Sequence, residues 1–398
     1  MPVRQILTFL VLSIVLTSCE VKENTEFREN LIETLESACK NYKYMAESLP
    51  KGKFPKTYED RKLITRDASS WTSGFYPGSL WYLYHWSGKE HLRSYALEYT
   101  NEIVPLQFDT ANHDLGWIIN SSVYNAYKVT HDSTYQTIIV NAAKSLLTRY
   151  NESVGLVRCW DATDWSNRFY LTYPANIDNM LNLELLINAT RFSGDSTFYH
   201  IAIGHADSTM KHHYRSDYSA YHVVDFNPQD GKVMKKVTAQ GYSDESSWTR
   251  GQAWGLYGFT MMYRETRKKR YLDHAKKVAS FIINHPNLSE DKIPYWDFDA
   301  PDIPDTYRDA SAGAIICSAL IELSTFVSDE QSTIYLSVAE RQLATLSSGN
   351  YLASIGENGN FILKHSVGGF PVNVEVDVPV TYADYYFIEA ILRYLKII

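Results

Sequence analysis

The chain has 398 residues, of which 45% are hydrophobic and 21% are charged, and its formal net charge is −8 at pH 7. This composition suits a globular protein with a large core, and the acidic balance argues against a nucleic-acid partner, which would need clustered lysine and arginine. Aromatic residues make up 14% of the chain. They supply the core and also suit a cleft in which sugar rings stack.

The first residues have the pattern of an export signal rather than of a folded domain. Arg4 precedes an apolar run over 6–16, and small residues follow before Cys19. The run is too short to cross a bilayer and is typical of a signal peptide, although an ordinary secretory signal or a core helix is the alternative. The segment 16–19, LTSC, resembles a bacterial lipobox, in which the cysteine is lipidated. We therefore expect a signal peptide over 1–18, a lipidated tether over 19–27 and one domain over 28–398.

Hydrophobic residues recur with helical spacing along most of the remaining chain. The spacing predicts helices over 28–48, 75–87, 90–106, 114–129, 133–149, 178–193, 196–212, 247–267, 270–284, 310–326, 330–347 and 381–396. They fall into pairs, of which the first helix is the more apolar and the second carries basic residues on one face. Six such hairpins with buried inner helices predict an all-α fold, an (α/α)6 barrel; an open solenoid of hairpins is the alternative.

Longer linkers interrupt the helices at 150–177, 214–246, 285–309 and 348–380. Long loops in a compact domain usually carry function, so we expect them to form one rim of the barrel, where the site lies. The second linker contains an extended stretch, and Pro228-Gln229-Asp230-Gly231 within it predicts the turn of a small β-hairpin.

Two acids stand at the starts of predicted first helices, Asp114 in HDLGW and Asp178 in NIDNM. An N-cap is the simple interpretation of each, because an aspartate at that position accepts hydrogen bonds from the first turn. The inner helices of a barrel run in one direction, however, so their N-termini converge at one end. Two carboxylates brought together there raise one another's pKa and can do acid–base work, so we expect a catalytic pair.

A third inner helix, in QGYSDESSWTRGQAWGLYGF, places Trp254 one turn beyond Arg250. An arginine among apolar residues needs an anionic partner, which is either Asp244 or Glu245 or a carboxylate of the substrate.

The extended segment before that helix carries Lys236, Thr238 and Gln240 at alternate positions. Alternate residues of a strand point the same way, so all three are candidates to border the cleft. For Lys236 a solvated strand face is the favoured interpretation. His222, just before the predicted hairpin, is a further candidate.

The sequence lacks the common motifs of metal, nucleotide and serine-hydrolase sites. Cys39, Cys159 and Cys317 are far apart and show no CxxC spacing, so we expect buried thiols and neither disulfides nor a metal site. No HExxH, GxSxG or glycine-rich phosphate loop occurs, and we expect no cofactor.

Several long motifs, in the right order, resemble those of the unsaturated glucuronyl hydrolases, glycoside hydrolase family 88. They are WTSGFYPGSLWYL from Trp71, HDLGW from His113, NIDNMLNLELL from Asn176, QGYSDESSWTRGQAWGLYGF from Gln240, and HSVGGFPVNVEVDVPVTYADYYFIEAIL from His365. The resemblance implies the same (α/α)6 barrel. It also implies hydration of a 4,5-unsaturated uronic acid left by a polysaccharide lyase. Asp178 matches the family's general acid and base, and Asp114 matches its essential partner carboxylate.

The resemblance also implies a substrate-binding set for an unsaturated uronyl oligosaccharide. His222, Gln240, Arg250 and Trp254 match positions that line the uronate subsite, and Trp71, Trp160 and Trp248 are candidates for stacking on sugar rings; His113, Lys236 and Thr238 are added from the motifs above. Ser366 falls where some members contact the second sugar. The second serine associated with sulfated substrates is absent here, which weighs against a preference for sulfated fragments.

Three other functions remain open from the sequence. The first is an unsaturated rhamnogalacturonyl hydrolase, from a sister family with a similar barrel and the same chemistry. The second is an inverting glycosidase acting on intact polysaccharide with two carboxylates. The third is a non-catalytic, lipid-anchored sugar-binding protein. In each case we expect a bacterial lipoprotein of the periplasm or outer membrane that touches the membrane only through its anchor; the sequence leaves the oligomeric state open.

Overall fold

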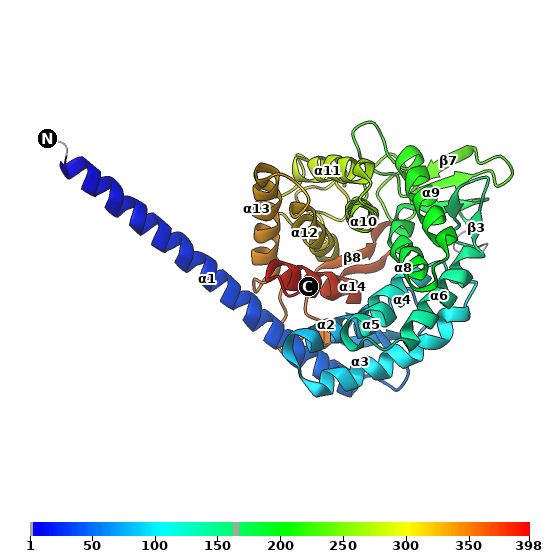
Figure 1. Ribbon diagram of the computed structural model, residues 1–398, viewed down its shortest axis with the longest axis horizontal. Coiled ribbons are helices and arrows are strands. Elements are labelled where there is room, and N and C mark those ends of the chain that lie inside the picture. Colours follow the sequence, from blue (N-terminus) through cyan, green and yellow to red (C-terminus); the bar gives the residue numbers. More distant parts are fainter. Residues whose placement is uncertain (1–2, 162–166) are drawn as a thin grey trace.

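The inner layer of the fold is a ring of helices around a common axis (Figure 1). The computed structural model describes residues 3–161 and 167–398, with side chains in the first helix from Thr25 onward. In this part of the chain the inner segments are α2 (Phe75–Ser87), α4 (Leu115–Ile119) continued by the π-helical turn η2 (Asn120–Tyr124) and α5 (Asn125–Thr130), η3 (Ile177–Asn182) with α8 (Leu183–Ser193), α10 (Thr249–Thr266), α12 (Ala310–Ser324) and α14 (Thr381–Tyr394).

The outer layer consists of the second helices of the pairs. They are α3 (Glu90–Ile103), extended by the 3-10 helix η1 (Val104–Phe108), α6 (Thr134–Leu147), α9 (Ser196–His212), α11 (Lys269–Ile283) and α13 (Asp329–Leu346), together with the C-terminal part of α1 (Val3–Ser48). The last inner helix, α14, packs against both α12 and α2, so the ring is closed. This closure confirms the predicted (α/α)6 barrel, and the open solenoid is wrong.

The two layers differ in the way their sequences are buried. Every residue of α12, ASAGAIICSALIELS, is buried, and its small residues allow neighbouring helices to approach closely. The outer helix α11 is amphipathic instead: Tyr271, Ala275, Val278 and Ile282 are buried at helical spacing, while its lysines face solvent. Cys39, Cys159 and Cys317 are buried free thiols, as predicted.

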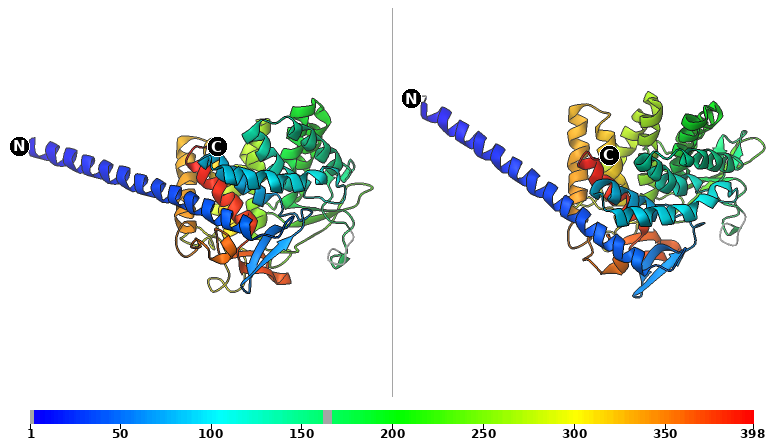
Figure 2. Two further views of the ribbon diagram at one scale, coloured as in Figure 1. Left: turned by 90° about the horizontal axis from the view of Figure 1, so that it is seen from below. Right: turned by 60° about the horizontal axis from the view of Figure 1, so that its bottom comes forward.

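Short strands gather where the inner helices begin. The hairpins are β1 (Phe54–Glu59) with β2 (Lys62–Arg66), β3 (Tyr150–Asn151) with β4 (Leu156–Val157), and β8 (Ser366–Gly369) with β9 (Val374–Val378), and β5 (Pro174–Asn176), β6 (Val223–Phe226) and β7 (Val233–Val237) form one antiparallel sheet in that order. The β6–β7 hairpin confirms the predicted turn. Figure 2 shows β1–β2 in blue and β8–β9 in orange at one end of the barrel, away from the C-terminus.

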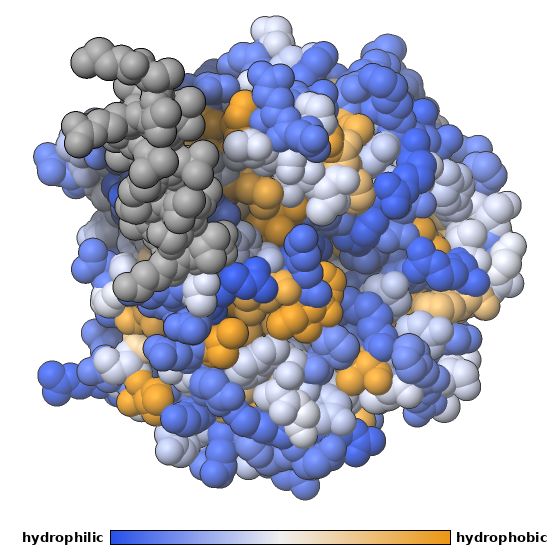
Figure 3. All heavy atoms as spheres, turned by 60° about the vertical axis from the view of Figure 1, so that its left-hand side comes forward, coloured by the Kyte–Doolittle hydropathy of each residue, from blue (hydrophilic) through white to orange (hydrophobic). Residues whose placement is uncertain are grey.

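Helix α1 extends well beyond the barrel at its N-terminal end (Figures 1 and 2), and its later part packs on α2 and α3. On the face seen in Figure 3, apolar side chains form separate patches among hydrophilic ones. No helix in the described part of the chain combines the length and the apolar character that a membrane span requires. The side chains of the predicted signal peptide, 1–18, and of Cys19 lie outside the described residues.

Candidate active site

The two acids lie at the same end of the barrel, each at the start of an inner helix. Asp114 directly precedes α4, and Asp178 is the second residue of η3. Asp114 occupies the N-cap position of α4, but its side chain makes no capping hydrogen bond within the described residues, and the N-cap of η3 is Asn176 rather than Asp178, so the N-cap interpretation is wrong for both. Their side chains are only 16% and 15% exposed. The acids are therefore largely withdrawn from water and free of the structural task that would explain them.

A side-chain amide joins the two helix starts. Asn182 Nδ2 donates to the carbonyl of His113 (2.8 Å), and Asn182 Oδ1 accepts from the Gly116 N–H (2.9 Å). Asn182 thus ties the residues that flank Asp114 to the helix that carries Asp178. The sequence analysis missed this link, although an asparagine in an otherwise apolar helix was a visible signal.

Gly116 makes that contact possible, because a Cβ atom there would lie 2.3 Å from Asn182 Cα. We expect Gly116→Ala to push the two helix starts apart, to cost about 1–3 kcal/mol of stability, and to lower kcat more than tenfold. Thermal melts and steady-state kinetics measure both effects. Gly349→Ala is the matched control, because nothing lies within 4 Å of the added methyl group. Equal melting temperatures and rates for both variants would contradict the packing argument.

Both carboxylates have a pKa raised from 3.8 to about 7. Desolvation is the largest cause in each case; the charge of Asp178 further raises the pKa of Asp114, and Arg250 acts against the rise at Asp178. Because each charge opposes the ionisation of the other, the two acids titrate as a pair that holds a proton near neutral pH. A shared, exchangeable proton is what acid–base catalysis needs.

A neutral histidine faces each acid. His113 Nε2 lies 3.3 Å from Asp114 Oδ1, and His222 Nε2 lies 3.7 Å from Asp178 Oδ2. Burial lowers the pKa of both histidines to about 3. His222 Nδ1 accepts from the Ala239 N–H (3.1 Å), so its proton is on Nε2, toward Asp178. The imidazole is therefore a neutral hydrogen-bond donor at the edge of the site.

Arg250 is 2% exposed at the start of α10. Its terminal nitrogens bind Asp309 Oδ2 (3.3 Å), Gln240 Oε1 (2.9 Å) and the carbonyls of Val367 and Gly368. Its Nε–H has no hydrogen-bond partner among the described residues. Arg250 therefore acts on the site through its charge and this remaining donor rather than through a free guanidinium fork.

The anionic partner of Arg250 differs from the predicted one. Asp244 accepts from the Thr238 N–H (2.8 Å), and Glu245 lies 3.6 Å from Arg215, so the prediction that one of these two acids pairs with Arg250 is wrong. The partner is Asp309, which caps the next inner helix by accepting from Ser311 N. Asp309 meets Arg250 because α10 packs beside α12. The two residues are far apart in the sequence, so no local pattern predicts the pair.

Aromatic rings surround the histidine and the arginine. The Trp248 ring lies 4.3 Å from that of His222 and 4.6 Å from the Arg250 guanidinium. Trp160 lies 6.0 Å from His222 with its ring edge-on. The structure thus brings the candidates Trp160, Trp248, His222 and Arg250 together on the side of Asp178.

Below the acids the rings form a floor. Trp71 packs against Trp117 (5.4 Å) and Tyr382 (4.9 Å), and Trp117 packs edge-on against Trp254 (4.5 Å). Trp254 is fully buried. It therefore supports the floor in this structure, whereas Trp71 is only partly buried and accessible.

The remaining candidates lie farther from the acids. Thr238 Oγ1 is 3.4 Å from His222 Nδ1, but strand β7 ends at Val237, so Thr238 and Gln240 belong to the turn that follows it. Lys236 Nζ lies 4.1 Å from the Tyr221 ring and, within the described part of the chain, makes no hydrogen bond or ion pair with either acid. Ser366, the first residue of β8, is fully buried beside the carbonyls that bind Arg250.

Arg149 is a site residue that the sequence analysis missed. It binds Asp161 through two nitrogens (2.8 and 3.0 Å) and donates to the carbonyls of Ala111 (3.1 Å) and Cys159 (2.7 Å). It thereby joins the segment before Asp114 to the loop that carries Trp160. In the sequence it ends a predicted helix and looks like any basic residue there.

The family is settled by a match over most of the chain: the family model Glycosyl Hydrolase Family 88 matches residues 48–395. The chain belongs to this family. The protein is therefore a glycosidase, and its fold and predicted family are confirmed.

Several relatives resemble the chain over nearly its whole length. The unsaturated glucuronyl hydrolase of Formosa agariphila is 40% identical, covering 97% of this chain and 98% of its own length. The unsaturated chondroitin disaccharide hydrolase of Streptococcus pneumoniae is 32% identical over 89% of this chain and 88% of its own. A solved unsaturated glucuronyl hydrolase specific for heparin is 43% identical, with a TM-score of 0.88 over 93% of this chain and 98% of that one.

Proposed function

We propose that the protein is an unsaturated glucuronyl hydrolase, which hydrates the C4=C5 double bond of a 4,5-unsaturated uronic acid at the non-reducing end of an oligosaccharide. The observation that carries this proposal is the pair Asp114 and Asp178, two buried carboxylates with pKa values raised to about 7. The names of the family 88 relatives support it. A sugar-binding protein would have no need to keep a proton on a buried acid beside a buried cation.

The proposed reaction follows from the proton on the pair. Asp178 donates its proton to C4 of the vinyl ether, and positive charge develops at C5 and the ring oxygen. Water adds its oxygen to C5 and returns a proton to the Asp178 carboxylate, while Asp114 stabilises the developing positive charge. The hemiketal formed at C5 then opens, the bond to the next sugar is lost, and the acid is ready for another cycle.

Binding of the substrate adds a negative charge to the active-site opening, the catalytic mouth, beside Asp178 and Arg250. Because Arg250 holds down the pKa of Asp178 in the free protein, a uronate carboxylate nearby offsets that effect and raises the pKa again. The bound substrate thus favours the protonated form of Asp178, which donates the proton to it.

The pH dependence of the rate tests this coupling. Activity needs a protonated acid, so it falls as the pH rises through the pKa of the pair. We expect kcat/KM, which reports the free protein, to fall above about pH 7, and kcat, which reports the complex, to fall at a pH at least about half a unit higher. The methyl ester of the same substrate, which lacks the negative charge, is the control and should bring the two curves together. A kcat curve that falls at the lower pH would contradict the coupling.

The activity itself is tested with purified protein lacking residues 1–19 and a panel of lyase-generated disaccharides. The panel includes hyaluronan, chondroitin, heparin and rhamnogalacturonan fragments, the heparin fragment because a 43% identical relative is specific for heparin. Loss of the ultraviolet absorbance of the C4–C5 double bond, with release of the second sugar, supports the proposal. Turnover of the rhamnogalacturonan fragment alone would point to the sister activity, and no change with any fragment would overturn the proposal in favour of a binding protein.

We also propose that the protein is a lipoprotein anchored through Cys19, on the support of the LTSC motif after the apolar run. Radiolabelled palmitate should enter the wild-type protein and the Cys39→Ala control, and should be absent from Cys19→Ala. Labelling of the Cys19→Ala variant would contradict the anchor.

A further inference from the structure

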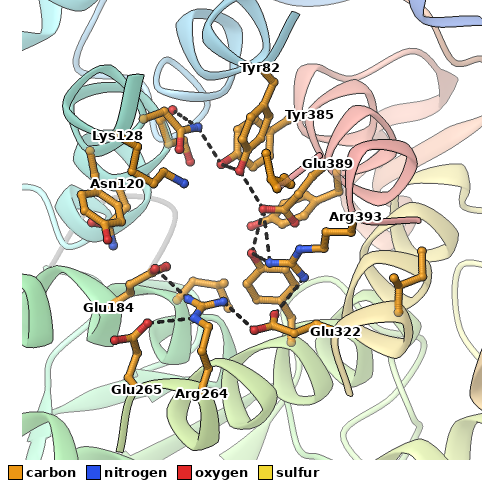
Figure 4. Close-up of a pocket in the computed structure, with 18 of the residues that line it drawn as sticks. Tyr82, Asn120, Lys128, Glu184, Arg264, Glu265, Glu322, Tyr385, Glu389 and Arg393 are labelled. Atoms are coloured by element: carbon orange, nitrogen blue, oxygen red, sulfur yellow. Dashed lines mark hydrogen bonds and ion pairs between the residues drawn. The ribbon is translucent and has the colours of Figure 1, made fainter. Parts of the chain in front are cut away.

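A cavity of about 640 Å³ lies toward the opposite end of the barrel, where the inner helices end. Figure 4 shows the side chains around it. The acids stand at the N-termini of the inner helices, whereas most residues around this cavity come from later turns of the same helices. Trp117, which forms part of the catalytic floor, also lines the cavity. Charged side chains from α5, α8, α10, α12 and α14 surround it, namely Lys128, Glu184, Arg191, Arg264, Glu265, Glu322, Glu389 and Arg393.

The glutamates of this cavity are already neutralised by arginines. Arg264 binds Glu184 and Glu322 (2.7 Å each), and Arg393 binds Glu322 (2.8 Å) and lies 3.5 Å from Glu389. The dashed lines of Figure 4 trace this network around one side of the cavity. Because each carboxylate has a cation beside it, this wall offers little attraction to a cationic ligand.

The opposite wall has polar groups without partners. Asn120 is 9% exposed, and both its amide nitrogen and its oxygen lack hydrogen-bond partners among the described residues; the same is true of the indole N–H of Trp117. Lys128 lies over the rings of Tyr124 (5.1 Å) and Tyr82 (5.6 Å), and no carboxylate of the described residues is within ion-pair distance. Lys128 is exposed, whereas Asn120 and Trp117 are buried. Because buried polar groups are normally paired, the unpaired groups of Asn120 and Trp117 indicate a missing ligand.

These groups share one face of a single helical stretch. Trp117, Asn120, Tyr124 and Lys128 all line the cavity, and the stretch contains the π-helical turn η2 (Asn120–Tyr124). Single π-helical turns are frequent at functional sites, where they redirect side chains. Desolvation by the surrounding walls lowers the pKa of Lys128, and a bound anion would raise it again.

We propose that this cavity binds a small hydroxylated carboxylate, the size of a hexuronic acid. The Lys128 ammonium would pair with the carboxylate, and the Asn120 amide and the Trp117 N–H would bind hydroxyl groups. The Tyr82, Tyr124 and Tyr257 rings supply the faces on which a sugar ring packs. The site is separate from the reaction proposed above and goes beyond it, because its ligand would lie on the far side of the aromatic floor.

Calorimetric titration of the full chain with glucuronate tests the proposal. Glucuronate can also enter the catalytic mouth, so the informative quantity is the difference between variants. We expect Lys128→Gln to remove one bound glucuronate per chain, or to weaken that site at least tenfold, and to leave kcat and KM for the disaccharide unchanged. Lys144→Gln, an exposed lysine on the outer helix α6, is the matched control and should bind as the wild type does. Asn120→Ala, checked by its melting temperature, should also weaken the site.

Neutral glucose and cationic glucosamine decide between a carboxylate site and a general sugar site. We expect neither to bind at the position that Lys128→Gln removes. Equal binding of glucose, glucuronate binding that Lys128→Gln leaves unchanged, or no binding beyond the catalytic mouth would each overturn the proposal. The binding measurements do not depend on turnover, so the proposed hydration can succeed or fail independently of them.

Discussion

Asp178→Asn is expected to lower kcat/KM by about 10³-fold or more, because an amide at this position cannot donate the proton to C4. The substitution preserves the shape of the side chain, and the helix does not lose its N-cap, because the N-cap residue of η3 is Asn176. The folded structure should therefore persist. Steady-state kinetics and circular dichroism of the same preparation measure the two effects.

The stability of this variant should exceed that of the wild type at high pH. The native protein keeps the Asp178 proton up to about pH 7, whereas an unfolded aspartate releases it near 3.8. The wild type therefore loses stability from this group as the pH rises from about 4 to 7, by at most on the order of 4 kcal/mol. Asparagine does not ionise, so Asp178→Asn should be the more stable protein at pH 8, and the difference should disappear near pH 4.

A second buried aspartate provides the matched control. Asp384 also has a pKa raised to about 7 by desolvation, but it accepts hydrogen bonds from the N–H groups of Ile362 and Leu363 (2.9 Å each) and from Tyr42. Asp384→Asn should therefore lower the melting temperature while retaining activity within a few-fold. An inactive Asp178→Asn variant that is also unfolded, or an active one, would contradict the role of Asp178.

The sequence predicted the helices and the acid pair because both depend on local patterns. Each predicted helix has a counterpart, and the inner-helix starts at Asp114 and Asp178 do converge. The contacts that hold the site are different: Asn182 binds the Gly116 N–H across 66 positions, and Arg250 meets Asp309 across 59. Such pairs follow from the packing of neighbouring helices, which hydrophobic spacing alone does not specify.

The short strands were missed for a related reason. β3 and β4 have two residues each and β5 has three, so they are too short for an alternating pattern to be seen. β3 pairs with β4 in a local hairpin, and β5 pairs with β6 from a later loop. The hairpin at Pro228–Gly231 was predictable because its turn residues are local.

The charged residues of the cavity at the other end could not be assigned from sequence patterns either. Glu184 and Arg264 interrupt helices that are otherwise apolar inside the ring, and each alone looks like a solvent-facing charge. Only the ring of helices shows that they meet at 2.7 Å. In the described part of the chain, the inner helices thus carry acids without a paired cation at one end and arginine-paired acids at the other. The first arrangement suits proton transfer, and the second leaves the cavity free for the proposed ligand.

Arg250→Met should impair both stability and catalysis. Removing the guanidinium leaves the Asp309 carboxylate, which is 0% exposed, without its cation. Breaking a buried pair in this way costs about 3–5 kcal/mol. The affinity for the anionic substrate should also fall, so KM should rise. Chemical denaturation and steady-state kinetics at pH 7 measure these losses.

The double variant Arg250→Met, Asp309→Asn separates the two effects. With no unpaired carboxylate left, it should recover much of the lost stability, and asparagine can still cap α12. Its catalysis should stay impaired, and its kcat/KM curve should fall at a higher pH than that of the wild type, because the charge that lowered the pKa of Asp178 is gone. A purely structural role for Arg250 predicts the reverse: activity that returns with stability, and a pH curve that does not move.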